Sequence, residues 1–491
     1  DVLAFRLTGY STDRDGYVDA LGIEDDVIND RDRLGVRAQL LYTPNDAVSV
    51  RLIADYSEID DVCCGAATVR NNFFAFNGAP LSDSLLTLLG VPPVSENQVF
   101  DDVVRVNQLP VSQNENSGVS AEINWDLDNG GTFTSITSLR SFDSVDVTDV
   151  DFSAAQLFNN TRTGESDVFT QEIRFTNNGD KLNYIVGAYY YNQNLDSTSS
   201  FDLGPTFNPL LLANPDLAAI VGGLNGLSAL TRGAFPRVAA PFGPNAFSHD
   251  EFQQDQEAWA IFGQLDYRLT EKLTLTAGLR FTDESKDVNG VFTQSAVGSA
   301  ADFTAIGTNL VLAGLGLAAP NPALFAPMYR PGWGHSAVPI IAPRPDVAAT
   351  LEDDQITGTI KLSWFANDTS MLYASYGTGY KSGGTNTDRI LVTQSQLFDA
   401  ETSESFELGI KTEFPNQNLR LNAALYLTTF DDFQTNSFAG GGFNLSNAGE
   451  MEAKGLEVEL YWAPTDDLVL NAGYAYNDAT FKTHERANCW I

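Results

Sequence analysis

The sequence predicts an all-β chain that crosses a membrane as an antiparallel β-barrel. Apolar and polar side chains alternate with a period of two in many segments, short and long connections take turns along the chain, and an aromatic residue stands before each short connection. A strand with this period presents one face to lipid and the other to a water-filled interior. The three observations together favour a transmembrane barrel over a helical protein or a soluble sandwich.

The alternation is clearest over residues 273–282, where five apolar residues alternate with polar or small ones. It recurs over 356–364 and 456–462, and in the last segment the polar face carries glutamates. The alternation and spacing rules predict about fifteen strands. These lie near 1–12, 31–43, 47–58, 117–127, 132–147, 165–176, 182–196, 255–268, 273–285, 352–365, 371–380, 402–414, 419–430, 450–463 and 468–480.

Every second connection between these strands is a short, turn-like segment. The short ones are 44–46, 128–131, 177–180, 270–272, 366–369, 415–417 and 464–467. The others are long: 13–30, 59–116, 148–164, 197–254, 286–351, 381–401 and 431–449. A soluble sandwich has no reason to sort its loops in this way, whereas an outer-membrane barrel has short periplasmic turns and long extracellular loops. The order of the connections therefore also predicts which rim faces which side.

The strand entering each short turn carries an aromatic residue near its end. These residues are Tyr42, Trp125, Phe175, Tyr267, Trp364, Phe414 and Trp462. Aromatic rings favour the level of the lipid headgroups, so the ring of seven predicts a periplasmic aromatic girdle. The polar faces fit a wide, wet interior, and the charged residues predicted to face it are Arg280, Lys361, Glu407, Lys411, Glu457 and Glu459.

The chain is strongly acidic, with 64 acidic and 28 basic residues and a formal net charge of −36. This charge would repel a phosphate backbone and excludes nucleic acid as a partner. The three cysteines, Cys63, Cys64 and Cys489, match neither a disulfide scaffold nor a zinc motif, and the adjacent pair is equally compatible with a local disulfide and with free thiols. The three histidines are scattered, so we expect no catalytic, cofactor or metal site.

Several segments resemble TonB-dependent outer-membrane receptors. The most specific stretch is 371–460, with YASYGTGYKSGG at 373–384, ETSESFELGIKT at 401–412 and NAGEMEAKGLEVEL at 447–460. The resemblance implies a 22-stranded barrel whose lumen holds a plug. Because about fifteen strands and no plug are visible, the sequence is expected to be a partial barrel domain over 1–491 that lacks the N-terminal plug and the C-terminal strands.

The resemblance also implies a function and a location. The expected protein is a multi-pass barrel of the bacterial outer membrane and not an enzyme; it imports a scarce nutrient, most often a ferric siderophore, with energy supplied through TonB. Its expected partners are outer-membrane lipid and lipopolysaccharide, the TonB complex through the missing plug segment, and the small-molecule ligand. Haem, cobalamin, oligosaccharides and aromatic compounds are equally compatible ligands. A passive porin or an adhesin is the alternative class, and a soluble multi-stranded enzyme is a third.

The long loop 286–351 contains the candidate substrate-binding residues. Its segment YRPGWGH combines aromatic, cationic and glycine residues, and the four candidates are Tyr329, Arg330, Trp333 and His335. Loops on a rigid barrel are the usual place for ligand contacts. The alternative is a loop that packs on itself through its aromatic rings.

Overall fold

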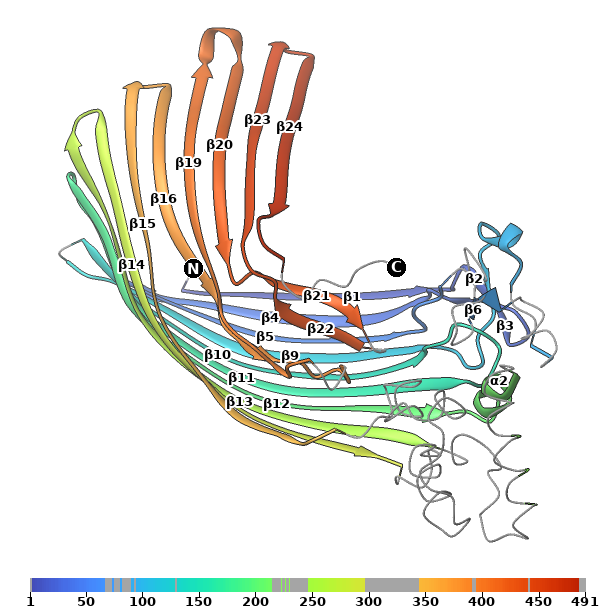
Figure 1. The fold of residues 1–491 in the computed structure, drawn as a ribbon. Helices are drawn as coiled ribbons and strands as arrows, with labels where there is room; N and C mark the ends of the chain where they lie inside the picture. Colours follow the sequence, from blue (N-terminus) through green and yellow to red (C-terminus); the bar gives the residue numbers. More distant parts are fainter. Residues whose placement is uncertain are drawn as a thin grey trace.

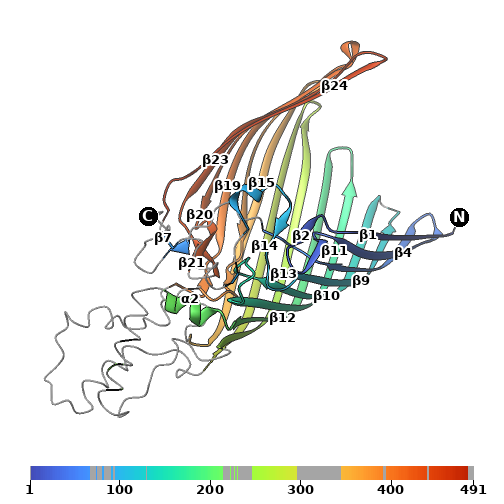
Figure 2. The same cartoon turned by 90° about the vertical axis from the view of Figure 1, so that its right-hand side faces the viewer.

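Fifteen long strands form one antiparallel sheet that curves into a trough (Figures 1 and 2). The computed structural model describes residues 2–66, 73–74, 80–81, 90–91, 94–128, 130–213, 222, 226, 229, 246–295, 344–390, 394–439 and 442–484. Each long strand pairs with the long strand before it in the chain, so the sheet is a meander. Within the described residues, β1 and β24 form the two edges, each with a partner on one side.

The predicted number of strands is confirmed. The long strands are β1 (Leu3–Arg14), β4 (Arg31–Asn45), β5 (Val48–Asp61), β9 (Val111–Asp126), β10 (Gly131–Asp149), β11 (Phe158–Asn178), β12 (Leu182–Leu203), β13 (Phe247–Thr270), β14 (Leu273–Gln294), β15 (Val347–Asn367), β16 (Ser370–Lys381), β19 (Glu401–Phe414), β20 (Leu419–Asp431), β23 (Met451–Thr465) and β24 (Leu468–Phe481). The seven predicted short turns all connect neighbouring strands, and one of them contains the 3-10 helix η3 (Pro415–Gln417).

Several strands extend beyond their predicted bounds at the end away from the short turns. β13 begins at Phe247 rather than near 255, and β14 ends at Gln294 rather than near 285. In these extensions, the face that is apolar nearer the turns carries charged residues such as Glu251 and Asp287. The apolar face therefore ends where the strand leaves the bilayer, although the backbone hydrogen bonds between the strands continue.

The pairing register separates an apolar face from a polar face. Residues directly opposite each other in an antiparallel pair point to the same side of the sheet. One such row joins Ala277, Ile360, Tyr376 and Phe406 across β14, β15, β16 and β19. The apolar face is exposed, with Leu279 68% and Ile356 69% accessible, as expected of a surface that faces lipid.

The predicted aromatic girdle lies on this apolar face. Six of its seven members are 38% to 52% exposed, namely Tyr42, Trp125, Tyr267, Trp364, Phe414 and Trp462. Phe175 is half-buried and packs against Tyr184, with 6.0 Å between the ring centroids. The girdle follows the rim of short turns, which is the rim assigned to the periplasm.

The long connections carry small elements of their own. Strands β2 (Val18–Ala20), β3 (Glu24–Ile28) and β8 (Val103–Val104) form a small sheet over a core of Val18, Ala20, Ile28, Val104 and Val106. The remaining described elements are β6 (Phe73–Phe74) with β7 (Pro80–Leu81), the 3-10 helix η1 (Glu96–Gln98), α2 (Phe207–Ala213), β17 (Gly384–Thr385) with β18 (Leu397–Phe398), and β21 (Gln434–Ala439) with β22 (Gly442–Asn447).

Cys63 and Cys64 are joined by a disulfide just after β5, while Cys489 lies outside the described residues. Within the part of the chain that is described, no helix is both long and apolar enough to cross a membrane.

The two faces predict very different losses of stability for the same substitution at adjacent residues of β15. Ile360 lies on the apolar face, 51% exposed, and Thr359 lies on the polar face. Ile360→Arg should reduce the free energy of unfolding by about 2–4 kcal/mol, because it places a cation in hydrocarbon near the bilayer midplane. Thr359→Arg should cost well under about 1 kcal/mol. Urea unfolding of the full-length protein in lipid vesicles measures both, and equal losses would contradict the assignment of the faces.

Candidate ligand-binding face

The polar face of the sheet lines the concave side and is the surface that a ligand in the lumen would meet. The six charged residues predicted to face the lumen share this face through the register. Lys361, Ser375 and Glu407, for example, form one row across β15, β16 and β19. The predicted inner wall is confirmed.

Aromatic rings and cations lie close to one another on this wall. The Arg280 guanidinium stands 5.7 Å from the ring centroid of Tyr189 and 5.8 Å from that of Phe262. The Tyr373 hydroxyl donates a hydrogen bond to the Glu407 carboxylate. Lys411 lies 5.9 Å from the Tyr373 ring. Such groups can contact both planar and charged solutes.

Nearer the extracellular rim, Glu284 joins three strands. Its carboxylate accepts a 2.7 Å hydrogen bond from Gln256 on β13 and a 3.4 Å hydrogen bond from Tyr380 on β16, and it forms a 2.9 Å ion pair with Lys286 on its own strand. Lys286 also donates to Ser382 Oγ and to the Gly383 carbonyl, each at 2.7 Å. The start of the loop after β16 is therefore fixed to the inner wall.

That loop, which we call the strap, comprises residues 382–390 and 394–400. It leaves β16 and folds back over the inner face to β13. There the Arg389 guanidinium makes three hydrogen bonds of 2.6 to 2.9 Å to the Asp250 carboxylate, and it also donates to the Thr293 carbonyl at 2.7 Å. The two side chains are 0% and 1% exposed. Burial raises the pKa of the Asp250 carboxyl even though Arg389 opposes the shift.

The hairpin β21–β22 packs on the strap and lies in the hollow of the sheet (Figure 1). Asn386 donates to the Leu445 carbonyl at 2.9 Å and accepts from the Leu445 amide at 2.7 Å. Gln434 donates to the carbonyls of Ser382 at 2.9 Å and Asp399 at 3.0 Å. Strap and hairpin thus form one hydrogen-bonded cap over the inner face at the extracellular end.

The four candidate residues from the sequence, Tyr329, Arg330, Trp333 and His335, lie outside the described residues. The cap residues Asp388 and Arg389 were not predicted as functional. A lone pair of opposite charges in a long loop usually marks a solvated turn, and nothing near it in sequence indicates partners on distant strands. In the described ranges, no group of three or more His, Cys, Asp or Glu side chains is arranged to hold a metal ion.

A pair of carboxylates, Asp149 and Asp151, lies where β10 ends and the next connection begins. Strands cross a bilayer in about 9–11 residues, so Asp149, at the far end of β10, stands beyond it. Asp149 is 2% exposed and accepts from the Asn107 amide at 2.9 Å, while Asp151 accepts from the Ser153 hydroxyl and the Phe158 amide. Burial, with the neighbouring Asp149 carboxylate, raises the pKa of Asp151 to about 7, and burial also raises the pKa of Asp149.

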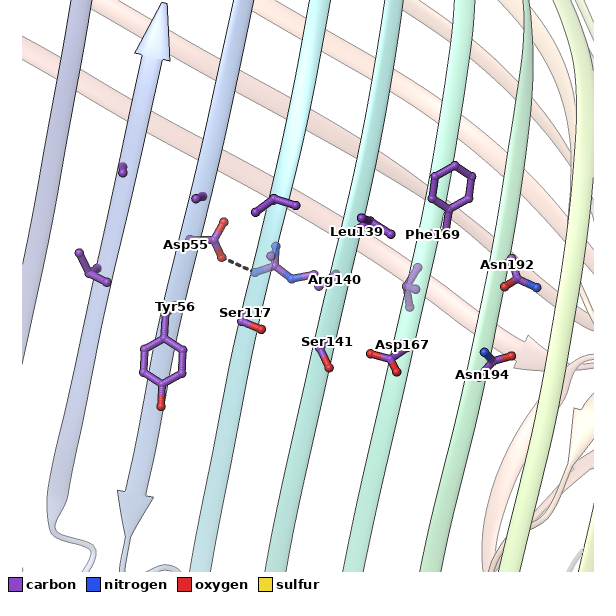
Figure 3. A pocket seen from close by; sticks show the side chains of 16 residues that line it. Asp55, Tyr56, Ser117, Leu139, Arg140, Ser141, Asp167, Phe169, Asn192 and Asn194 are labelled. Carbon is purple, nitrogen blue, oxygen red and sulfur yellow. Dashed lines mark hydrogen bonds and ion pairs between the residues drawn. The ribbon is translucent and has the colours of Figure 1, made fainter.

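A groove of about 650 Å³ lies mainly on the outer face of β4 to β12, and Figure 3 shows the side chains that line it. Small residues such as Ala38 and Ala54 leave room beside Leu139 and Phe169. The Arg140–Asp55 ion pair, at 2.5 Å, borders the groove from the polar side of the sheet. Since the groove opens toward lipid, it is not a candidate for the lumenal ligand.

A wide antiparallel sheet with an apolar outer face, a polar inner face and short turns at one rim defines an outer-membrane β-barrel. The family described as "TonB dependent receptor-like, beta-barrel" matches residues 65–488, and the chain belongs to this family. The family consists of transport receptors of the bacterial outer membrane rather than enzymes. The resemblance noted in the sequence is therefore confirmed.

Three relatives illustrate the similarity. The chain is 34% identical over 110 residues, 22% of its length and 16% of the relative's, to the pesticin receptor of Yersinia enterocolitica. It is 27% identical over 131 residues, 26% of its length and 17% of the relative's, to the probable TonB-dependent siderophore receptor PiuA of Acinetobacter baumannii. In fold it resembles the ferric yersiniabactin uptake receptor FyuA of Yersinia pestis, with a TM-score of 0.62 at 16% identity. That likeness covers 98% of this chain and 58% of FyuA, so this chain spans less than two thirds of that receptor.

The carboxylate pair predicts a pH-dependent loop. The folded pKa of Asp151 lies above its ordinary value of 3.8, so the folded loop binds the proton more tightly than the unfolded chain does. Its stability should be greatest below about pH 4 and should fall as the pH rises through about 7. Asp151→Asn should make this slope shallower and leave only the part that Asp149 contributes. Hydrogen exchange of the Asn107 and Phe152 amides, corrected for intrinsic exchange rates, measures the pH dependence of the loop's stability. Asp143→Asn is the control. An unchanged slope in Asp151→Asn would contradict the assignment.

The buried ion pair predicts an asymmetry between single and double substitutions. Arg389→Ala leaves the Asp250 carboxylate buried without its cation and should destabilise the folded strap by about 3–5 kcal/mol. The double variant Arg389→Leu with Asp250→Leu should recover most of that loss, because neither charge of the pair is left buried without its partner. Hydrogen exchange of strap amides measures both. If the double variant were as unstable as the single one, the loss of stability would not come from leaving a buried charge unpaired, and the prediction would be contradicted.

Proposed function

We propose that the complete protein imports a scarce nutrient across the outer membrane and that the nutrient is a ferric siderophore. The observation that carries the proposal is the sequence similarity to receptors whose names specify this class, including the probable siderophore receptor PiuA. The inner face of the sheet supports it, since rings such as Tyr189 and cations such as Arg280 suit a large, polar, partly aromatic ligand.

Energy coupling through TonB is part of the same proposal. The chain covers 58% of the yersiniabactin receptor, and we infer that the complete protein also has a plug and the remaining strands of a 22-stranded barrel. On this proposal residues 1–491 are a partial barrel domain, the TonB complex engages the plug segment, and lipid and lipopolysaccharide surround the apolar face. Haem, cobalamin, oligosaccharides and aromatic compounds remain alternative ligands.

We also propose that Tyr329, Arg330, Trp333 and His335 contact the ligand. Their support is the sequence of the loop itself, which places aromatic, cationic and imidazole groups within seven residues. A passive porin or an adhesin is the competing function. It would need neither TonB nor a tight ligand, and the cap over the inner face argues against a freely open channel.

Iron-limited growth and ligand binding test the function together. The full-length gene should support growth on at least one ferric siderophore from a panel in a strain that lacks other receptors, and deletion of tonB should abolish that growth. TonB-independent uptake of several unrelated small solutes, with ion conductance in planar bilayers, would instead identify a porin.

In the same strain, Trp333→Ala and Arg330→Ala should weaken binding of the ferric siderophore by roughly 5- to 30-fold, as expected for anchor residues in a binding site. Met328→Ala, in the same loop, is the matched control. Wild-type affinity in both variants would remove the loop assignment while leaving the transport function intact.

A further inference from the structure

One row of the inner face carries opposite charges on strands two apart. Arg162 on β11 is directly opposite Ser199 on β12, and Ser199 is directly opposite Asp250 on β13. The strap carries the complementary sequence, Asp388 followed by Arg389. Asp388 pairs with Arg162 at 2.9 Å, and Arg389 pairs with Asp250 at 2.6 Å. Two consecutive strap residues therefore bind two different strands of the wall.

The two halves of this contact differ in strength. The Arg389–Asp250 pair is fully buried, and several hydrogen bonds hold it. In the other pair Arg162 is 47% and Asp388 13% exposed, and one oxygen of Asp388 contacts Arg162. A partly exposed ion pair contributes little to stability and exchanges readily with other anions. The contact at Arg162 is the half that can open.

Asp388 also links the strap to the hairpin. Its second carboxylate oxygen accepts a 2.8 Å hydrogen bond from the Phe443 amide of β22. Movement of Asp388 would therefore loosen the hairpin as well as the strap. The root of the strap would stay in place, because Lys286 and the Asp353 carboxylate, which accepts a 3.0 Å hydrogen bond from the Gly383 amide, hold it separately.

We propose that the strap is an autoinhibitory latch in which the Asp388 carboxylate occupies Arg162, an anion-binding residue of the inner face. An anionic group entering from outside would replace the Asp388 carboxylate on Arg162. The strap then swings away from β11 and β12 while Arg389–Asp250 serves as the pivot. The identification of that anion with a nutrient rests on the proposed function, whereas the latch itself does not.

The charges around Arg162 make the exchange selective. Asp146 on β10 is directly opposite Arg162 in the strand register, so an anion that approaches Arg162 also meets the negative charge on this neighbouring strand. Arg162 also donates to the Asn160 side chain at 2.8 Å, which keeps the guanidinium in place after Asp388 leaves. A carboxylate or another oxyanion that accepts two hydrogen bonds from the guanidinium would compete best, because charge-assisted bidentate contacts are the strongest of this kind.

A reporter cysteine beneath the strap tests the latch without any siderophore. In the full-length receptor in outer-membrane vesicles, Ser199→Cys is combined with Cys489→Ser, and the labelling rate with a membrane-impermeant maleimide is measured. Asp388→Asn should raise the rate roughly fivefold. Asp399→Asn is the matched control, since in the described contacts Asp399 holds the strap through its backbone. Equal rates in the two variants would overturn the latch.

Two further measurements separate a latch from general loosening. The charge exchange Arg162→Asp with Asp388→Arg should restore the slow rate. Citrate, used as the probe anion, should accelerate labelling more than sodium chloride at matched ionic strength. No difference between citrate and chloride would overturn release by anions. Neither result depends on whether a ferric siderophore is the nutrient.

Discussion

The structure depends on one constraint: in hydrocarbon every backbone N–H and C=O must find a partner within the protein. The meander meets it by pairing each long strand with its predecessor, from β1 to β24. Because side chains alternate across such a ladder, pairing the backbone also divides the residues between two faces. Sequence changes are then tolerated or costly according to the face on which they fall.

That division organises the parts that bear on function. The apolar face, with its aromatic girdle, fixes the height of the sheet in the membrane, while the polar face can hold charged groups such as Arg280 and Glu284 without contact with lipid. At the extracellular end the strands continue past the bilayer, and their inner faces become anchor points for loops. Arg162 and Asp250 lie on these extensions, so the same ladder that spans the membrane also positions the cap.

The sheet could be predicted from the sequence because its signals are local. Alternation over about ten residues and a turn after it are enough to place β14 or β23, and the aromatic residues before the turns indicate the rim. The strand extensions were missed, since beyond the bilayer both faces are polar. The cap could not be predicted, because Arg389 binds a residue 139 positions away and Asp388 one 226 positions away. Such contacts depend on the curvature of the sheet, which no local pattern specifies.

The assignment of the two faces is the claim on which the rest depends, and spin labels placed one at a time from 353 to 364 on β15 test it most directly. In lipid vesicles, collision rates with oxygen, which dissolves in the bilayer, and with a water-soluble nickel complex should alternate with a period of two. Oxygen should be favoured at Ile356, Ile360 and Leu362, and nickel at Thr357, Thr359 and Lys361. A profile without this alternation, or one with the phases exchanged, would contradict the account.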